Sequence, residues 1–161
     1  MANSPNIAPY GSWKSPITSD LIVEGSVGLG QTAFDGDDIY WIELRPKERG
    51  RNVLVKRSAN GECVDVTPPP FNARTRVHEY GGGEYLVHNG IVYFSNFSDQ
   101  RVYKQDGLGT PQPLTGAGDV RYADGTMDQT RGRIIYVRED HRIAGSEAVN
   151  SIVSVNIEPG D

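Results

Sequence analysis

A short pattern that occurs three times along the chain constrains its fold more than any other feature. In each copy a small turn is followed by an aliphatic residue, a tyrosine and a further apolar residue, at residues 37–42, 89–94 and 132–137. The tyrosines at positions 40, 93 and 136 are 53 and 43 residues apart. Repeats of about 40 to 50 residues built from short strands are typical of a β-propeller, in which each blade is a four-stranded antiparallel sheet.

Further strand patterns surround the first two tyrosine strands, in the order that a blade requires. Short β-branched and aromatic runs lie between turn residues such as Asn60-Gly61 and Asn89-Gly90, where glycine supplies a positive φ. These runs predict two complete four-stranded blades, with strands at 31–34, 39–43, 52–56 and 64–67 in the first and at 84–87, 91–95, 101–104 and 112–115 in the second.

The third repeat is shorter than the other two. It predicts strands at 122–128, 133–139 and 151–157, and the sequence ends at Asp161 before a fourth. We therefore predict an all-β fold, a partial β-propeller of about two and three quarter four-stranded antiparallel blades. The expected organisation is an N-terminal lead-in at 1–29 and a partial propeller at 30–161, with blades at roughly 30–70, 80–116 and 120–161.

An incomplete ring leaves blade faces and a strand edge unpaired, and a propeller needs at least about four blades. The chain is therefore expected to be the N-terminal piece of a longer protein or to assemble with copies of itself. The run Leu21-Ile22-Val23 has no place in the three blades. It is a candidate for an extra strand that completes a terminal blade, in its own chain or in a neighbour.

Composition excludes several classes of function. The net charge of −5, without a dense Lys/Arg cluster, argues against nucleic acid as a partner. The N-terminus lacks the pattern of a signal peptide and no apolar run is long enough to span a membrane, so we expect a cytoplasmic protein. Cys63 is the single cysteine, which excludes an internal disulfide and a multi-cysteine metal site. We expect no cofactor and no metal.

Residues 76–83 hold the densest group of functional side chains. Arg76, His78, Glu79 and Tyr80 precede a predicted inner strand and are candidates for contacting a peptide in the central channel or a neighbouring domain. The alternative is structural: the three glycines at 81–83 allow strands to approach closely near the axis while the polar side chains bind neighbouring blades. The sequence leaves both readings open.

No catalytic centre is predicted in the chain. His78-Glu79 is followed by Gly82 where a zinc-binding helix would need a second histidine, and His88 and His141 are isolated in the sequence. A Gly-x-Ser-x-Gly nucleophile elbow occurs nowhere. We therefore predict that this chain alone does not hydrolyse peptides.

Residues 8–18, 75–83 and 92–101 resemble the N-terminal region of prolyl oligopeptidase family proteins, in the acylaminoacyl-peptidase-like or dipeptidyl-aminopeptidase-like branch. The resemblance implies a parent serine peptidase with an N-terminal β-propeller and a C-terminal α/β-hydrolase domain that carries a Ser-Asp-His triad. It also implies that the propeller restricts access of large substrates.

The expected function is that of a non-catalytic propeller portion, which gates peptide substrates and docks to the hydrolase domain. The alternative is a stand-alone binding or scaffold module that completes a propeller by self-association.

Overall fold

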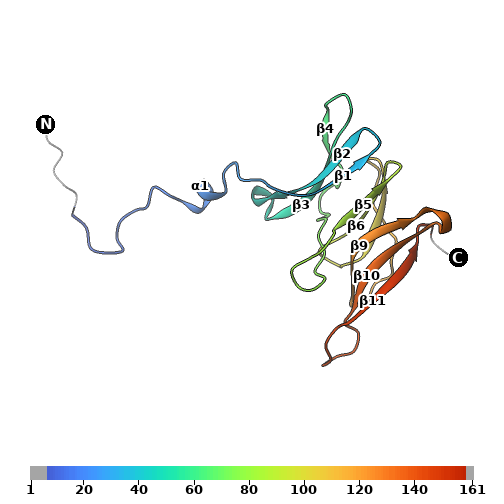
Figure 1. Cartoon of the computed structure of the whole chain (residues 1–161). Helices are drawn as coiled ribbons and strands as arrows, with labels where there is room; N and C mark the ends of the chain where they lie inside the picture. Colours follow the sequence, from blue (N-terminus) through green and yellow to red (C-terminus); the bar gives the residue numbers. More distant parts are fainter. Residues whose placement is uncertain (1–6, 159–161) are drawn as a thin grey trace.

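The computed structural model describes residues 7–158, which form three antiparallel sheets preceded by an extended N-terminal segment (Figure 1). The first sheet has four strands joined in chain order, with the 3-10 helix η1 (Pro46–Glu48) between its second and third strands. Its strands are β1 (Gly28–Asp35), β2 (Asp38–Arg45), β3 (Arg51–Arg57) and β4 (Cys63–Asp65).

The second and third sheets repeat this meander. The second has four strands in chain order, and the third has three in the order β11-β10-β9, with η2 (Gln129–Arg131) between β9 and β10. The strands of the second are β5 (Tyr85–His88), β6 (Ile91–Ser95), β7 (Val102–Asp106) and β8 (Gln112–Pro113). Those of the third are β9 (Val120–Asp128), β10 (Arg133–Asp140) and β11 (Val149–Asn156).

The first strands of the three sheets are neighbours, since β1 lies beside β5 and β5 beside β9. In a propeller the first strand of each blade lies nearest the axis. The predicted all-β partial propeller is therefore confirmed, as three antiparallel sheets of four, four and three strands.

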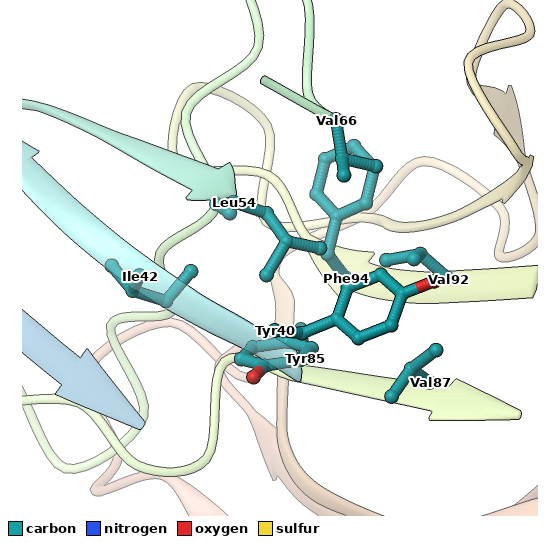
Figure 2. Close-up of a cluster of buried hydrophobic side chains, with 9 residues drawn as sticks. Tyr40, Ile42, Leu54, Val66, Tyr85, Val87, Val92 and Phe94 are labelled. Carbon is teal, nitrogen blue, oxygen red and sulfur yellow. The ribbon is translucent and has the colours of Figure 1, made fainter. Parts of the chain in front are cut away.

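Two apolar cores hold the blades together, one on each side of the middle blade. Phe94 and Tyr93 are consecutive on β6, so their side chains point to opposite faces of the sheet. Phe94 enters the core between the first and second blades, and Tyr93 enters the core between the second and third. Figure 2 shows the first of these cores, formed by Tyr40, Ile42, Leu54, Val66, Ala73, Tyr85, Val87, Val92 and Phe94.

The repeat tyrosines pack between the blades, because Tyr40, Tyr93 and Tyr136 all belong to these two cores. Trp41 is not part of either core. It follows Tyr40 on β2 and therefore points to the other face of that sheet, where its indole N–H donates to Glu43 Oε1 at 3.1 Å.

The prediction of an extra strand at Leu21-Ile22-Val23 is wrong. These residues lie in a single helical turn, α1 (Ser19–Val23), within the segment that extends away from the sheets (Figure 1). Thr18 caps the turn by accepting the backbone N–H of Leu21 on its hydroxyl at 3.1 Å, and Asp20 places a carboxylate in the first turn. The capping residues outweigh the β-propensity of three aliphatic residues.

In the described part of the chain, no helix has the length and apolar character needed to cross a membrane.

Candidate functional site

The segment that links the first blade to β5 is fixed against the third blade by hydrogen bonds between Gly83 and Asp124, of which one is accepted by the Asp124 side chain. Gly83 N–H donates to Asp124 Oδ1 at 2.7 Å, and Asp124 N–H donates back to the Gly83 carbonyl at 2.9 Å. A Cβ on Gly83 would lie 2.8 Å from that carboxylate oxygen, and one on Gly82 would lie 2.9 Å from Ala123 Cβ. Glycine is therefore needed here so that the segment can approach β9.

Glu139, at the end of β10, is the centre of an ion-pair network beneath this segment. Its side chain is 6% exposed and accepts the backbone N–H of His78 at 2.7 Å on Oε1. His78 Nδ1 lies 3.1 Å from the same oxygen, while His141 Nε2 lies 3.0 Å and Arg121 Nη1 3.6 Å from Oε2. Burial acts to raise the pKa of Glu139, but the hydrogen bonds from His141 and His78 outweigh it and hold the pKa below its ordinary value.

Arg121 connects this network to the segment itself. Its guanidinium donates to the Arg76 carbonyl at 2.8 Å and to Glu79 Oε1 at 2.6 Å. The pKa of Glu79 is lowered by this contact with Arg121. His78 and Glu79 both have positive φ, 55° and 65°, a conformation that non-glycine residues adopt rarely. The network holds the backbone of the segment in this tight turn.

The four predicted site residues therefore separate into two groups. His78 and Glu79 join the ion-pair network, whereas the Arg76 guanidinium lies 5.1 Å over the ring of Phe97 and Tyr80 is 85% exposed. Sequence reasoning missed Arg121, Glu139 and His141, which are 42 to 63 residues away from His78 and Glu79 in the chain. A weak signal for them in the sequence is the Glu139-x-His141 spacing at the end of a strand.

A cleft of about 350 Å³ lies beside the same segment, between the first and second blades. Its walls come from β1, β2 and β3 of the first blade and from the segment that leads to β5. Its lining residues are Gly28, Leu29, Gly30, Ile42, Leu44, Asn52, Arg74, Tyr80 and Glu84. Tyr80 is thus a predicted site residue that lines this cleft, whereas Arg76, His78 and Glu79 are not among its lining residues.

Glu84 is the ionisable group of greatest interest in this cleft, and the sequence did not single it out. Its backbone N–H donates to Gln31 Oε1 at 2.7 Å, which fixes it against β1. Both carboxylate oxygens lie 3.4 Å from Asn52 Nδ2. Burial raises the pKa of Glu84 to about 7, although Arg74 and Asn52 act in the opposite direction.

The raised pKa of Glu84 makes folding stability depend on pH. Because the folded state binds this proton more tightly than the unfolded state, the stabilisation is fully present below the ordinary carboxyl pKa of 4.5. It is lost as the pH rises through about 7. Around neutral pH, Glu84 therefore changes between a neutral acid and a carboxylate.

Comparison with known proteins identifies the larger protein that this chain resembles. A puromycin hydrolase, seen in two crystal structures of which one is a mutant complexed with PGG, matches with a TM-score of 0.81 and 32% identity over 93% of this chain. A puromycin-hydrolyzing peptidase of Mycobacterium tuberculosis matches with a TM-score of 0.78 and 34% identity over 94%. No family model and no curated protein matches the sequence.

The chain spans 25% of the length of each of these solved proteins. The match extends over nearly the whole chain. The resemblance to the prolyl oligopeptidase family is confirmed: the chain resembles one quarter of puromycin hydrolase, a peptidase of that family.

Proposed function

We propose that this chain is a non-catalytic propeller portion of a serine peptidase, where it gates peptide substrates and docks to an α/β-hydrolase domain. The observation that carries the proposal is the match of 93% of the chain to 25% of a puromycin hydrolase. Three sheets are fewer than a propeller ring requires. The remaining three quarters of such a protein supply the other blades and the catalytic domain.

Exposed apolar side chains at both ends of the row of blades support this proposal. On β1, Leu29 and Phe34 are 74% and 72% exposed, and on β11, Ile152 is 71% exposed. Large apolar side chains on strands are normally covered by a neighbouring sheet, and clusters of them at a surface mark interaction sites. These two ends are where further blades of a closed ring would pack.

Side-chain chemistry in the chain also supports a non-catalytic role. Within residues 7–158 no serine hydroxyl is hydrogen-bonded to a histidine. The buried carboxylate that binds histidines, Glu139, is also paired with Arg121, as expected for a structural network rather than for a base that activates a nucleophile. Catalysis is accordingly assigned to the hydrolase domain of the parent protein.

The purified chain is expected to release no nitroaniline from aminoacyl-nitroanilides, because its described residues include no serine hydroxyl bonded to a histidine base. Release can be followed by absorbance, with a mock purification from cells that lack the chain as the control. Turnover that co-purifies with the chain and exceeds the mock preparation would contradict the proposal.

A module that completes a propeller by self-association is the second candidate, and the same exposed side chains on β1 and β11 favour it. Mass measurement in solution separates the two candidates. A discrete dimer favours self-association, because two copies supply six sheets. A monomer or a polydisperse mixture favours a portion of a longer propeller.

A further inference from the structure

Two arginines of the segment before β5 stack on a single aromatic ring of the middle blade. Arg74 Cζ lies 5.2 Å and Arg76 Cζ lies 5.1 Å from the centroid of the Phe97 ring. Phe97 belongs to the loop between β6 and β7. The two guanidiniums therefore meet at one place on the protein, although they come from a different segment than the ring that carries them.

Hydrogen bonds of the backbone fix the ring and both arginines in place. The Phe97 carbonyl accepts a hydrogen bond from Gln100 Nε2 at 2.9 Å. Arg76 N–H donates to Gln100 Oε1 at 2.7 Å, and Arg74 N–H donates to the Ser95 carbonyl at 2.9 Å. Because the backbone is fixed and the long side chains rest on the ring, less conformational entropy is lost when these guanidiniums bind a partner.

Stacking leaves the hydrogen-bond donors of both guanidiniums available. A guanidinium carries five N–H donors in its plane, and a stacked ring covers only its face. Within residues 7–158, neither side chain donates a hydrogen bond or forms an ion pair. Arg74 is exposed, and of the three nitrogens of the Arg76 guanidinium only Nε is buried without a partner. The terminal nitrogens can therefore reach a ligand.

Carboxylates of the surrounding segments do not neutralise this pair of arginines. Asp99 accepts the hydroxyl of Tyr103 at 2.7 Å, and Glu79 is bound to Arg121 at 2.6 Å. Glu84 forms no ion pair with any group in the described part of the chain. In a chain with a net charge of −5, two neighbouring arginines without a carboxylate partner are an exception that calls for a ligand.

A carboxylate fits this arrangement. Its two oxygens can accept two parallel N–H bonds from the edge of one guanidinium, which adds orientation as well as energy. The positive charge of the second guanidinium, held on the same ring, strengthens the attraction. Every peptide with a free C-terminus carries such a group, and its charge persists at neutral pH.

We propose that Arg74 and Arg76, stacked on Phe97, form a binding site for the C-terminal carboxylate of a peptide. The inference rests on the proposed function, because a propeller that gates peptides must contact them. It extends the sequence prediction, which named Arg76 and passed over Arg74 and Phe97. Peptides with an amidated C-terminus lack the charge and one of the two acceptor oxygens, so this site binds them more weakly.

NMR titration of the whole chain with N-acetyl-glycyl-glycine, compared with the amide of the same compound, tests the proposal. Neither probe has a free amino group, so the comparison measures the effect of the carboxylate alone. At low ionic strength we expect the acid to bind about fivefold more tightly than the amide. The Nε–H signals of Arg74 and Arg76 are expected to shift with the acid and not with the amide.

Three variants show whether these arginines are responsible. Arg74→Gln combined with Arg76→Gln is expected to lower the affinity for the acid to that for the amide. Lysine at both positions keeps the charge but removes the planar pair of donors, and should leave only about a twofold preference for the acid. Arg57→Gln, which removes an exposed arginine at the end of β3, should leave the affinity unchanged.

Equal affinity for acid and amide, full affinity in the double glutamine variant, or no binding of the acid at millimolar concentration would each overturn the inference. Inorganic phosphate that binds as tightly as the acid would also overturn it, by showing a general anion site. The thermal transition of each variant shows that it is folded. Failure here leaves the propeller assignment intact, whereas hydrolysis by the chain alone would remove the proposed function without changing the binding result.

Discussion

Replacement of Phe94 by alanine is expected to destabilise the chain by about 3 to 5 kcal/mol. The Phe94 ring is 1% exposed and lies in the core between the first and second blades (Figure 2). Its centroid lies 5.9 Å from that of Phe71 and 5.8 Å from that of Tyr103. A cavity at this point weakens both the blade and its contact with the neighbouring blade. Since small domains have a net stability of only about 5 to 15 kcal/mol, much of the stability is lost.

Urea denaturation followed by tryptophan fluorescence measures this loss. A matched control is Phe34→Ala, which removes the same ring from an exposed position on β1 and should change the free energy of unfolding by about 0.5 kcal/mol or less. Similar losses in the two variants would show that the aromatic residues between the blades do not form the main core.

Replacement of Glu139 by alanine is expected to cost about 3 kcal/mol, the second large effect. The substitution removes the acceptor of the His78 backbone N–H and the shared partner of His141 and Arg121. It therefore leaves the His78 backbone N–H without this acceptor and leaves Arg121 with Glu79 as its remaining carboxylate partner among the described residues. The turn at residues 77–80, with its two positive φ values, is held by this network and is expected to open.

The control for Glu139 comes from the same network. Glu79 binds the same Arg121 guanidinium, at 2.6 Å, but its side chain is 76% exposed, so Glu79→Ala should have a much smaller effect. Protease sensitivity of the turn, together with urea denaturation, measures both variants. Equal losses from the exposed and the buried carboxylate would contradict the role assigned to Glu139.

The strands of this fold were predictable from the sequence because each repeat carries its own local signals. The alternation around Tyr40, Tyr93 and Tyr136 and the Asn-Gly turns fix strand positions within a few residues. Where these signals are weak, the prediction failed. At Leu21-Ile22-Val23 the Thr18 cap stabilises a helical turn despite the β-propensity of the side chains. This cap is a hydrogen bond from the backbone to the Thr18 side chain, which the hydrophobic pattern does not reveal.

The candidate site was predictable only in part, because its geometry arises between blades. The segment at 76–83 was recognised from its density of polar residues and glycines. Its partners Arg121 and Glu139 come from β9 and β10, more than 40 residues away. Glu84 was overlooked because nothing in the sequence distinguishes it from an exposed glutamate. Its raised pKa results from burial in the folded chain, and the hydrogen bond from Asn52 of the first blade acts in the opposite direction.

These observations join the fold to the proposed function. The ion-pair network fixes the segment from Arg76 to Gly83, and the end of this segment places Tyr80 and Glu84 beside the cleft. An opening of the turn by loss of Glu139 is therefore expected to disturb the cleft as well. The exposed ends of the blade row remain available to the rest of a larger protein.

The most direct test of the central claim is a chimera. In it, this chain replaces the matching quarter of the Mycobacterium tuberculosis puromycin-hydrolyzing peptidase, to which it is 34% identical. The chimera is expected to hydrolyse puromycin, whereas the peptidase without that quarter and the isolated chain are expected to release no product. A chimera that shows a cooperative thermal transition but hydrolyses no puromycin would contradict the assignment of this chain to the propeller of such a peptidase.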